Sequence, residues 1–244
     1  MHDREPERAP PSPAPRDPSW VTGLGLVALV ALIGAQAVGL QQAPDSDMGD
    51  LQKIMYVHVP AAWNAFLAFG AVFVLGILYL WRRWEHVDLL AAAFAEAGTV
   101  LTGLTLALGS IWGRPTWGVW WTWDARLTTT AVLFVLFVGY LALRAFTDDA
   151  ERRARWSAAV GILGFLNVIV VYKSVQWWRT LHQVQSSPST VAPEYVTALR
   201  LNAVAFLLAL AYFTARRYTI ARAERAIEDR IEALALSEEH HAPV

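Results

Sequence analysis

The 244-residue sequence contains no cysteine, and only 17% of its residues are charged. Without cysteine, the chain itself forms no disulfide, Cys-ligated zinc site, iron–sulfur cluster, CxxC redox pair or covalent cofactor attachment through CxxCH. A typical soluble domain has roughly 25% charged residues, and the net charge here is only −1. These values exclude a disordered chain and a strongly basic protein that binds nucleic acid, and they argue against a soluble enzyme.

Apolar residues instead make up 55% of the sequence and fall in long runs. A helix that crosses a bilayer needs about 20 mainly apolar residues. The third run contains Glu96 and the fifth contains Lys173, yet nothing but a membrane span accounts for the apolar remainder of either run. We therefore predict an all-α integral membrane protein with six transmembrane helices in a lipid bilayer. Their expected ranges are 20–40, 61–81, 89–111, 127–146, 156–176 and 196–215.

The two ends of the chain differ from this apolar body. Residues 1–19 hold six of the twelve prolines, which indicates a disordered tail and not a cleaved secretory signal. Residues 216–244 are charged and favour a helix, so we expect a cytoplasmic helical tail after a membrane domain of residues 20–215. Its apolar residues share one helix face, which suits a solvated or membrane-lying helix or, alternatively, a dock for a cytoplasmic partner. They are Ile220, Ile227, Ile231 and Leu234.

The distribution of lysine and arginine predicts how the chain is oriented. Loops on the cytoplasmic side of a membrane carry an excess of these residues. The two tails and the second and fourth loops together hold 14 of them, whereas the other three loops hold 4. We therefore expect both termini in the cytoplasm and three outer loops, at 41–60, 112–126 and 177–195.

Two histidines fall in these outer loops, His58 in the first and His182 in the third. Pro60 suits the first position of a helix, so we expect His58 to lie just outside the second span. Each histidine alone fits an interfacial side chain bonded to water or to a loop carbonyl. Together, two neutral imidazoles on one face suit a transition metal. They are an incomplete set for zinc but a sufficient axial pair for haem iron.

The second outer loop is rich in tryptophan. An aromatic belt explains one or two tryptophans at each helix end, but not five within twelve residues. The wide, rigid faces of indoles suit a large flat conjugated ligand, and Arg114, Arg126 and Arg179 are suited to pair with ligand carboxylates. We expect Asp124 to orient Arg126 or an indole N–H. The five tryptophans are Trp112, Trp117, Trp120, Trp121 and Trp123.

At these residues the chain resembles a known family. The segment Trp117–Thr128 resembles the WGxxWxWDxRLT signature of the haem-handling proteins of cytochrome c maturation, the WWD-domain family, with every fixed position present. Tyr56–Trp63 and Trp177–Gln183 are similar to the two outer histidine motifs of that family. The length and the six spans resemble its shortest branch, haem exporter protein C. Lys173, just before the third motif, departs from the apolar or aromatic residue expected there.

The resemblance implies a multi-pass protein of the bacterial inner membrane that binds haem b at the periplasmic face. It implies delivery of haem to the chaperone CcmE beside the ABC transporter subunits CcmA and CcmB and the small membrane subunit CcmD. His58 and His182 would be the axial ligands of the iron, and the tryptophan-rich loop 112–128 would cradle the haem. The remaining expected site residues are Trp112, Trp117, Trp120, Trp121, Trp123, Asp124, Arg126, Trp177, Trp178 and Arg179.

Other functions remain open at this point. The residues contain no Ser–His–Asp arrangement, phosphate-binding glycine loop or carboxylate pair, so we expect a haem-handling factor and not an enzyme, with a lyase-like part in haem attachment as the remaining option. One alternative is a six-span solute or ion transporter subunit with outer gating histidines. Others are a larger cytochrome c synthase, which would have more spans, and a structural subunit with an aromatic belt.

Overall fold

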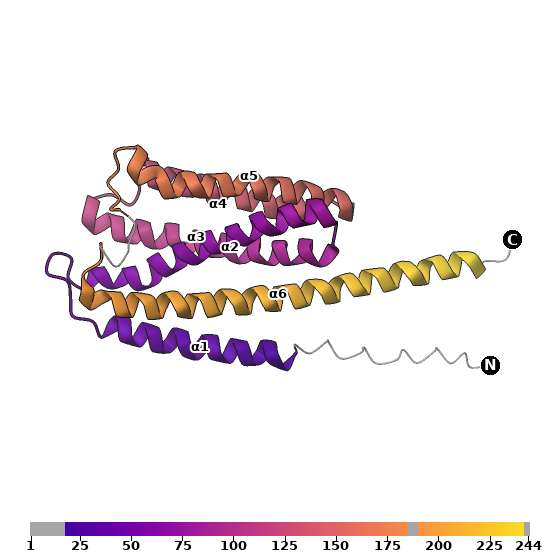
Figure 1. Ribbon diagram of the computed structural model, residues 1–244, viewed down its shortest axis with the longest axis horizontal. Coiled ribbons are helices and arrows are strands. Elements are labelled where there is room, and N and C mark those ends of the chain that lie inside the picture. Colours follow the sequence, from indigo (N-terminus) through magenta and orange to yellow (C-terminus); the bar gives the residue numbers. More distant parts are fainter. Residues whose placement is uncertain (1–17, 185–189, 242–244) are drawn as a thin grey trace, which may run out of the picture.

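The computed structural model describes residues 18–184 and 190–241, and its regular structure there is helical. Six of the helices are long and apolar enough to cross a membrane, which confirms the predicted six-span all-α fold. A short 3-10 helix, η1, runs directly into the second of them (Figure 1). The elements are α1 (Ser19–Leu40), η1 (Asp50–Ile54), α2 (Met55–Arg82), α3 (Glu85–Trp117), α4 (Ala125–Ala145), α5 (Ala150–Trp177) and α6 (Pro193–His241).

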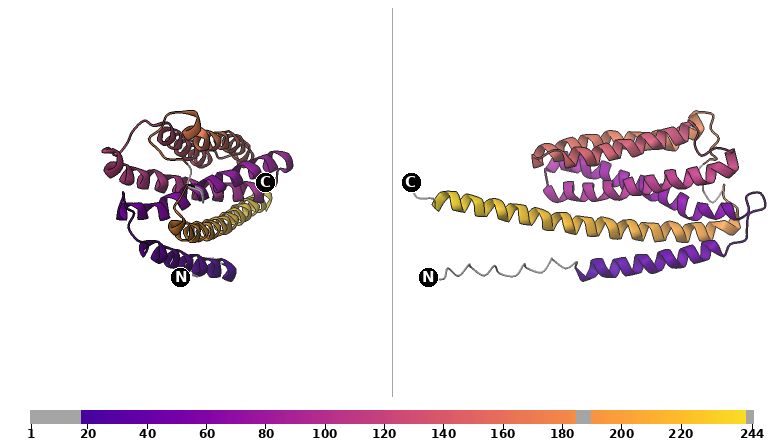
Figure 2. Two further views of the ribbon diagram at one scale, coloured as in Figure 1. Left: turned by 60° about the vertical axis from the view of Figure 1, so that its left-hand side comes forward. Right: turned by 180° about the vertical axis from the view of Figure 1, so that it is seen from behind.

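The helices pack side by side with α2 and α3 in the middle. Helix α1 lies against α6, α6 against α2 and α3, and the α4–α5 pair covers the other side of α2 and α3 (Figures 1 and 2). The short turns at 83–84 and 146–149 lie at one end, which we call the turn end. The segments 41–54 and 118–124 lie at the other, which we call the loop end. The charge distribution predicts that the turn end faces the cytoplasm.

Aromatic rings fill the middle of the bundle. Phe69 of α2 stacks on Phe137 of α4 with ring centroids 3.7 Å apart, and Tyr140 follows one turn later; all three are almost completely buried. Close approach depends on small residues on the facing helices. A Cβ atom at Gly98 would lie 2.7 Å from the Phe69 ring, so only glycine leaves room for that ring against α3.

The start of α2 differs from the prediction. The helix begins at Met55, so Pro60 lies inside it and His58 is helical, not held outside the helix. Proline cannot donate to the carbonyl four residues earlier, which here belongs to Tyr56. That carbonyl instead accepts a hydrogen bond from Gln36 Nε2 of α1 at 3.4 Å. A partner from another helix therefore lets the helix continue through the proline.

The tryptophan-rich segment is also only partly a loop. Helix α3 extends to Trp117, so Trp112 and Trp117 are helical, and the loop proper is 118–124. Gly118 ends the helix with φ of 81°, a left-handed conformation that favours glycine, and its N–H donates to the carbonyl of Arg114. The predicted loop 112–128 is therefore divided between α3, a seven-residue connection and the start of α4.

Helix α6 continues without a break through the boundary predicted at residues 215/216. Its buried residues run from Ala198 to Thr214, and residues 215–237 are exposed or half-buried. At ~1.5 Å per residue its 49 residues span about 70 Å, well over the ~30 Å hydrocarbon core of a bilayer. The residues of the expected helical tail are therefore helical, and they form the far half of helix α6, continuous with the sixth span. The predicted disordered tail lies outside the described residues except for its last two, Pro18 and Ser19.

Candidate functional site

A cavity at the loop end brings together residues that are far apart in the sequence. Both outer histidines line it, together with four tryptophans and Arg126. Helices α2, α3, α4 and α5 and the segment after α5 all contribute to its walls. The side chains that matter most below are Gln52, His58, Trp63, Thr105, Trp112, Trp117, Trp121, Arg126 and His182.

His58 enters this cavity from the beginning of α2 and packs tightly against α3. A Cβ atom at Gly109 would lie 3.2 Å from His58 Cε1, so the imidazole rests against the helix backbone at a position where a side chain would crowd it. The Nδ1 atom of His58 is buried, and it has no hydrogen-bond partner among the described residues. Buried polar atoms are normally hydrogen-bonded, so an unpaired ring nitrogen beside a cavity indicates a functional group.

His182 reaches the cavity from the segment that follows α5. Its Nδ1 lies 2.8 Å from the carbonyl oxygen of Gln183, which can only accept, so Nδ1 carries the proton and Nε2 keeps its lone pair. Burial lowers the pKa of His182; the Gln183 contact opposes this shift and the nearby Arg126 charge adds to it. The structure thus favours a neutral imidazole, which is the form that binds metals.

Arg126 lies at the start of α4 and is held by neutral groups. Its Nε donates to Ser174 Oγ at 3.2 Å, and its Nη2 donates to the Tyr172 carbonyl at 3.5 Å. Among the described residues it forms no ion pair with a carboxylate. Its guanidinium therefore retains the capacity to bind an anionic group.

The tryptophans divide into two sets. Trp112 and Trp117 pack edge to face with centroids 5.4 Å apart, and both line the cavity with Trp121. Trp120 and Trp123 lie outside the lining and are 59% and 81% exposed. Trp177 and Trp178 pack against each other outside the cavity and are also more than half exposed, and Arg179 is exposed beside them. Some of the predicted site residues thus form the cavity wall, and others are exposed aromatic side chains outside the lining.

Asp124 does not line the cavity and binds neither an indole N–H nor the guanidinium of Arg126 in the hydrogen bonds of the described residues. It caps α4 by accepting from the Arg126 backbone N–H at 2.9 Å. It also accepts from Thr180 Oγ1 and from the Leu181 backbone N–H, both at 2.8 Å. Burial raises its pKa, but these hydrogen bonds outweigh burial and the net shift is downward. Asp124 is therefore ionised, and its carboxylate connects the start of α4 to the segment that carries His182.

Several residues of this site were not singled out from the sequence. Thr105 of α3 and Trp63 of α2 line the cavity, and Gln52 of η1 does so while it is almost completely buried. Ser174 and Thr180 do not line the cavity: Ser174 accepts a hydrogen bond from Arg126, and Thr180 donates one to Asp124. Trp63 belongs to the quoted histidine motif, and Thr105 is a polar residue in an apolar run, so both carried a signal. The parts of Ser174 and Thr180 depend on tertiary contacts that no local pattern indicates.

The donor set argues against a bare metal ion. In the part of the chain that the structure describes, no group of three or more His, Asp and Glu side chains is placed to hold one. Two imidazoles, several indoles and an arginine without a carboxylate partner among the described residues instead suit a flat ligand that brings its own metal and carries an anionic group.

Six apolar helices and a ligand cavity at one end define the class of the chain, a multi-pass helical membrane protein. The model of the family "Heme exporter protein C" matches residues 15–233, and the chain belongs to this family. It is 39% identical over 180 residues to heme exporter protein C of Bradyrhizobium diazoefficiens (70% of this chain, 68% of the relative). The proteins of the same name from Escherichia coli K12 and Haemophilus influenzae are 34% and 37% identical, over 81% and 78% of this chain and 82% and 79% of their own lengths. The chain is thus a multi-pass inner-membrane protein.

Proposed function

We propose that the protein binds haem b in the cavity at the loop end and delivers it to a haem chaperone during maturation of c-type cytochromes. The observation that carries the proposal is the meeting of His58 and His182 at one cavity with tryptophan walls. The relatives are named heme exporters, which supports the same cargo.

The residues present fit this cargo. Haem supplies an iron that accepts two axial imidazoles in addition to the four porphyrin nitrogens. Nε2 of His182 offers a lone pair, since Nδ1 is bonded to Gln183. The indoles of Trp112, Trp117 and Trp121 offer faces and edges for stacking on the ring. Arg126 is placed to pair with a carboxylate of the ligand.

Delivery in this proposal is an act of positioning, and the chain contributes no nucleophile of its own. The exposed aromatic group (Trp120, Trp123, Trp177 and Trp178) lies outside the cavity lining and is available to a partner. We propose the chaperone CcmE as that partner, and CcmA, CcmB and CcmD as the other subunits of the export complex. Because heme exporter names a transport function, we propose no enzymatic role.

A transporter with gating histidines is less well supported. A solute path through the bundle needs polar residues along its middle. That region is filled by a cluster of buried apolar and aromatic side chains, including Phe69, Leu133, Phe137 and Val171.

The proposal is tested by the absorption spectrum of the purified protein with haem. We expect a Soret band with low-spin features of two imidazole ligands. His58→Gly and His182→Gly should each lose the low-spin spectrum or the haem, and free imidazole should restore it by entering the vacated space. Rescue should weaken below about pH 6.5, where free imidazole becomes protonated.

His86 provides the matched control, because it lies at the turn end and stacks on Trp84 with centroids 5.6 Å apart. His86→Gly should leave the spectrum unchanged. Wild-type spectra in both cavity variants without imidazole would show that neither histidine is a ligand.

A further inference from the structure

We propose that Asp124 is a positioning residue that sets the axial ligand His182 and Arg126 relative to each other, and that it does not contact haem. This inference rests on the proposed function. It assigns a part to the one acidic residue of the tryptophan-rich loop, which stands outside the cavity lining although its neighbours Trp121 and Arg126 line it.

The first step is the path of hydrogen bonds from Asp124 to His182. The carboxylate accepts the hydroxyl proton of Thr180 at 2.8 Å and the backbone N–H of Leu181 at 2.8 Å. Thr180 Oγ1 in turn accepts the backbone N–H of His182 at 3.0 Å. Three consecutive residues are thus tied to one carboxylate, and the third of them is the proposed ligand.

The second step is that this segment has no regular secondary structure. Helix α5 ends at Trp177, and residues 179–184 belong to no helix or strand. Loop segments that lack a backbone ladder are the most mobile parts of a protein. Because bonds to a charged acceptor are stronger than neutral ones, a single carboxylate can order such a segment.

The third step is the hydrogen bond between Asp124 and the start of α4. The same carboxylate caps α4 through the N–H of Arg126, whose guanidinium lines the cavity. The two cavity groups come from segments 56 residues apart, as measured between Asp124 and Thr180. Asp124 therefore links the proposed ligand for iron to the proposed partner of the ligand's carboxylate.

Only a carboxylate satisfies these donors. Its two oxygens accept from three donors, namely a hydroxyl and two backbone N–H groups. In Asp124→Asn one oxygen becomes an NH₂ donor of the same size, which then faces a donor of the protein. The exchange alters the hydrogen bonding with almost no change in volume.

The test compares Asp124→Asn in two backgrounds. In the otherwise wild-type protein we expect haem affinity to fall at least tenfold, with partial loss of the low-spin spectrum. In His182→Gly with saturating imidazole, the free ligand no longer depends on the segment and only the link to Arg126 remains, so the same change should cost clearly less affinity than in the otherwise wild-type protein. Equal losses in both backgrounds would overturn the proposal, since they would indicate direct contact with haem or a general defect.

Two further variants separate positioning from folding. Thr180→Val breaks the path to His182 but leaves the cap of α4 intact, and it should reproduce the background-dependent loss, whereas Thr180→Ser keeps the hydroxyl and should behave as wild type. Asp149→Asn makes the same exchange at another helix cap, the one at the turn end that accepts from Arg152 N–H at 2.6 Å, and should leave affinity unchanged. A comparable loss in Asp149→Asn, or none in Thr180→Val, would contradict the proposal.

A ligand-free measurement keeps this inference separate from the proposed function. Amide hydrogen exchange in the segment around Leu181 and His182 should accelerate at least tenfold in Asp124→Asn and in Thr180→Val without haem. If the wild-type protein bound no haem, the proposed function would fail while this exchange result still stood. Unchanged exchange in both variants would show that Asp124 does not order the segment.

Discussion

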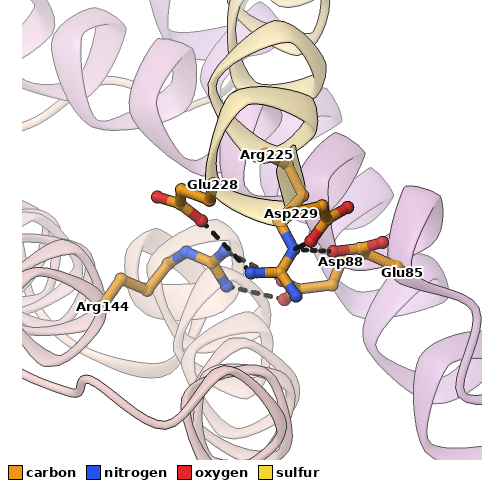
Figure 3. A network of polar contacts seen from close by, with 6 residues as sticks. All are labelled: Glu85, Asp88, Arg144, Arg225, Glu228 and Asp229. Atoms are coloured by element: carbon orange, nitrogen blue, oxygen red, sulfur yellow. Dashed lines mark hydrogen bonds and ion pairs between the residues drawn. The ribbon is translucent and has the colours of Figure 1, made fainter. Parts of the chain in front are cut away.

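The two ends of the bundle differ in whether their buried polar side chains have charged partners within the protein. At the turn end, Arg144 of α4 forms a two-pronged ion pair with Asp88 of α3, with distances of 2.6 and 2.9 Å (Figure 3). At the loop end, Arg126 donates to neutral oxygens, and the buried Nδ1 of His58 has no partner within the described ranges. The turn end pairs its buried arginine with a carboxylate, whereas the cavity at the loop end keeps an imidazole nitrogen and a guanidinium available for a ligand.

The contacts at the turn end join three helices. Arg225 of α6 pairs with Glu85 at the start of α3 at 2.7 Å and with Glu228 and Asp229 of its own helix (Figure 3). Its partners are more than half exposed, so these pairs add little stability each. Deeper in the bundle, Arg217 of α6 binds Glu96 of α3 at 2.8 Å. The predicted span carboxylate therefore has an arginine partner, and Lys173 instead donates to Gln176.

The comparison is sharpest if the two ends lie on opposite sides of the membrane. The chain lacks cysteine, so single cysteines at exposed sites report on sidedness. In intact cells we expect a membrane-impermeant maleimide to label Val119→Cys at the loop end and to leave Asp148→Cys at the turn end unlabelled until lysis. The reverse pattern would invert the predicted orientation and place the cavity on the cytoplasmic side.

Breaking the buried pair at the turn end should have the largest effect on stability. The side chains of Arg144 and Asp88 are only 12% and 10% exposed. Asp88→Ala leaves the guanidinium buried without its partner, which costs about 3–5 kcal/mol of unfolding free energy. Denaturation of the purified protein in detergent measures this loss.

Two controls accompany that variant. Glu85→Ala breaks an exposed pair and should cost about 1 kcal/mol or less. The double change Asp88→Leu with Arg144→Met replaces both charges by apolar groups and should recover most of the stability. A double variant as unstable as Asp88→Ala would show that the pair does more than satisfy its own charges.

Crowding His58 should weaken ligand binding in addition to lowering stability. Gly109→Ala places a Cβ 3.2 Å from His58 Cε1, and overpacking of this kind costs about 1–3 kcal/mol. We expect haem titration to show roughly tenfold weaker binding. Gly103→Ala is the matched control, since its Cβ would also lie 3.2 Å from a ring atom, that of Phe134, away from the cavity. Equal losses of haem affinity in the two variants would mean that crowding His58 has no specific effect on haem binding.

Changes in the two sets of tryptophans should affect haem binding differently, and by less than the change at Gly109. Trp121 lines the cavity, whereas its edge-to-face neighbour Trp123 is 81% exposed. Trp121→Ala removes a stacking surface worth on the order of 1 kcal/mol, so haem affinity should fall about fivefold. Trp123→Ala should leave affinity within twofold and reduce transfer to the chaperone. The opposite pattern in a transfer assay would reverse these assignments.

The sequence predicted the six spans, and it predicted that His58, His182 and the tryptophans lie at the same end of the bundle. Both predictions use apolar runs and loop charges, which can be read directly from the order of residues. It did not predict where the helices end. The continuation of α2 through Pro60 depends on Gln36, 20 residues away from the carbonyl that it satisfies. The part of Asp124 depends on Thr180, 56 residues away. Such contacts form only when distant segments pack together, so they cannot be predicted from the propensities of neighbouring residues.

Helix α6 connects the two ends in a mechanical sense. Its Ala198 and Leu199 pack on Tyr56, at the beginning of the helix that carries His58, and its far turns stand clear of the other helices (Figure 1). Between Glu194 and His241 it contains neither proline nor glycine, the residues at which helices usually bend. A force applied to the far end of α6 is therefore transmitted along an unbent helix to Tyr56, two residues before His58.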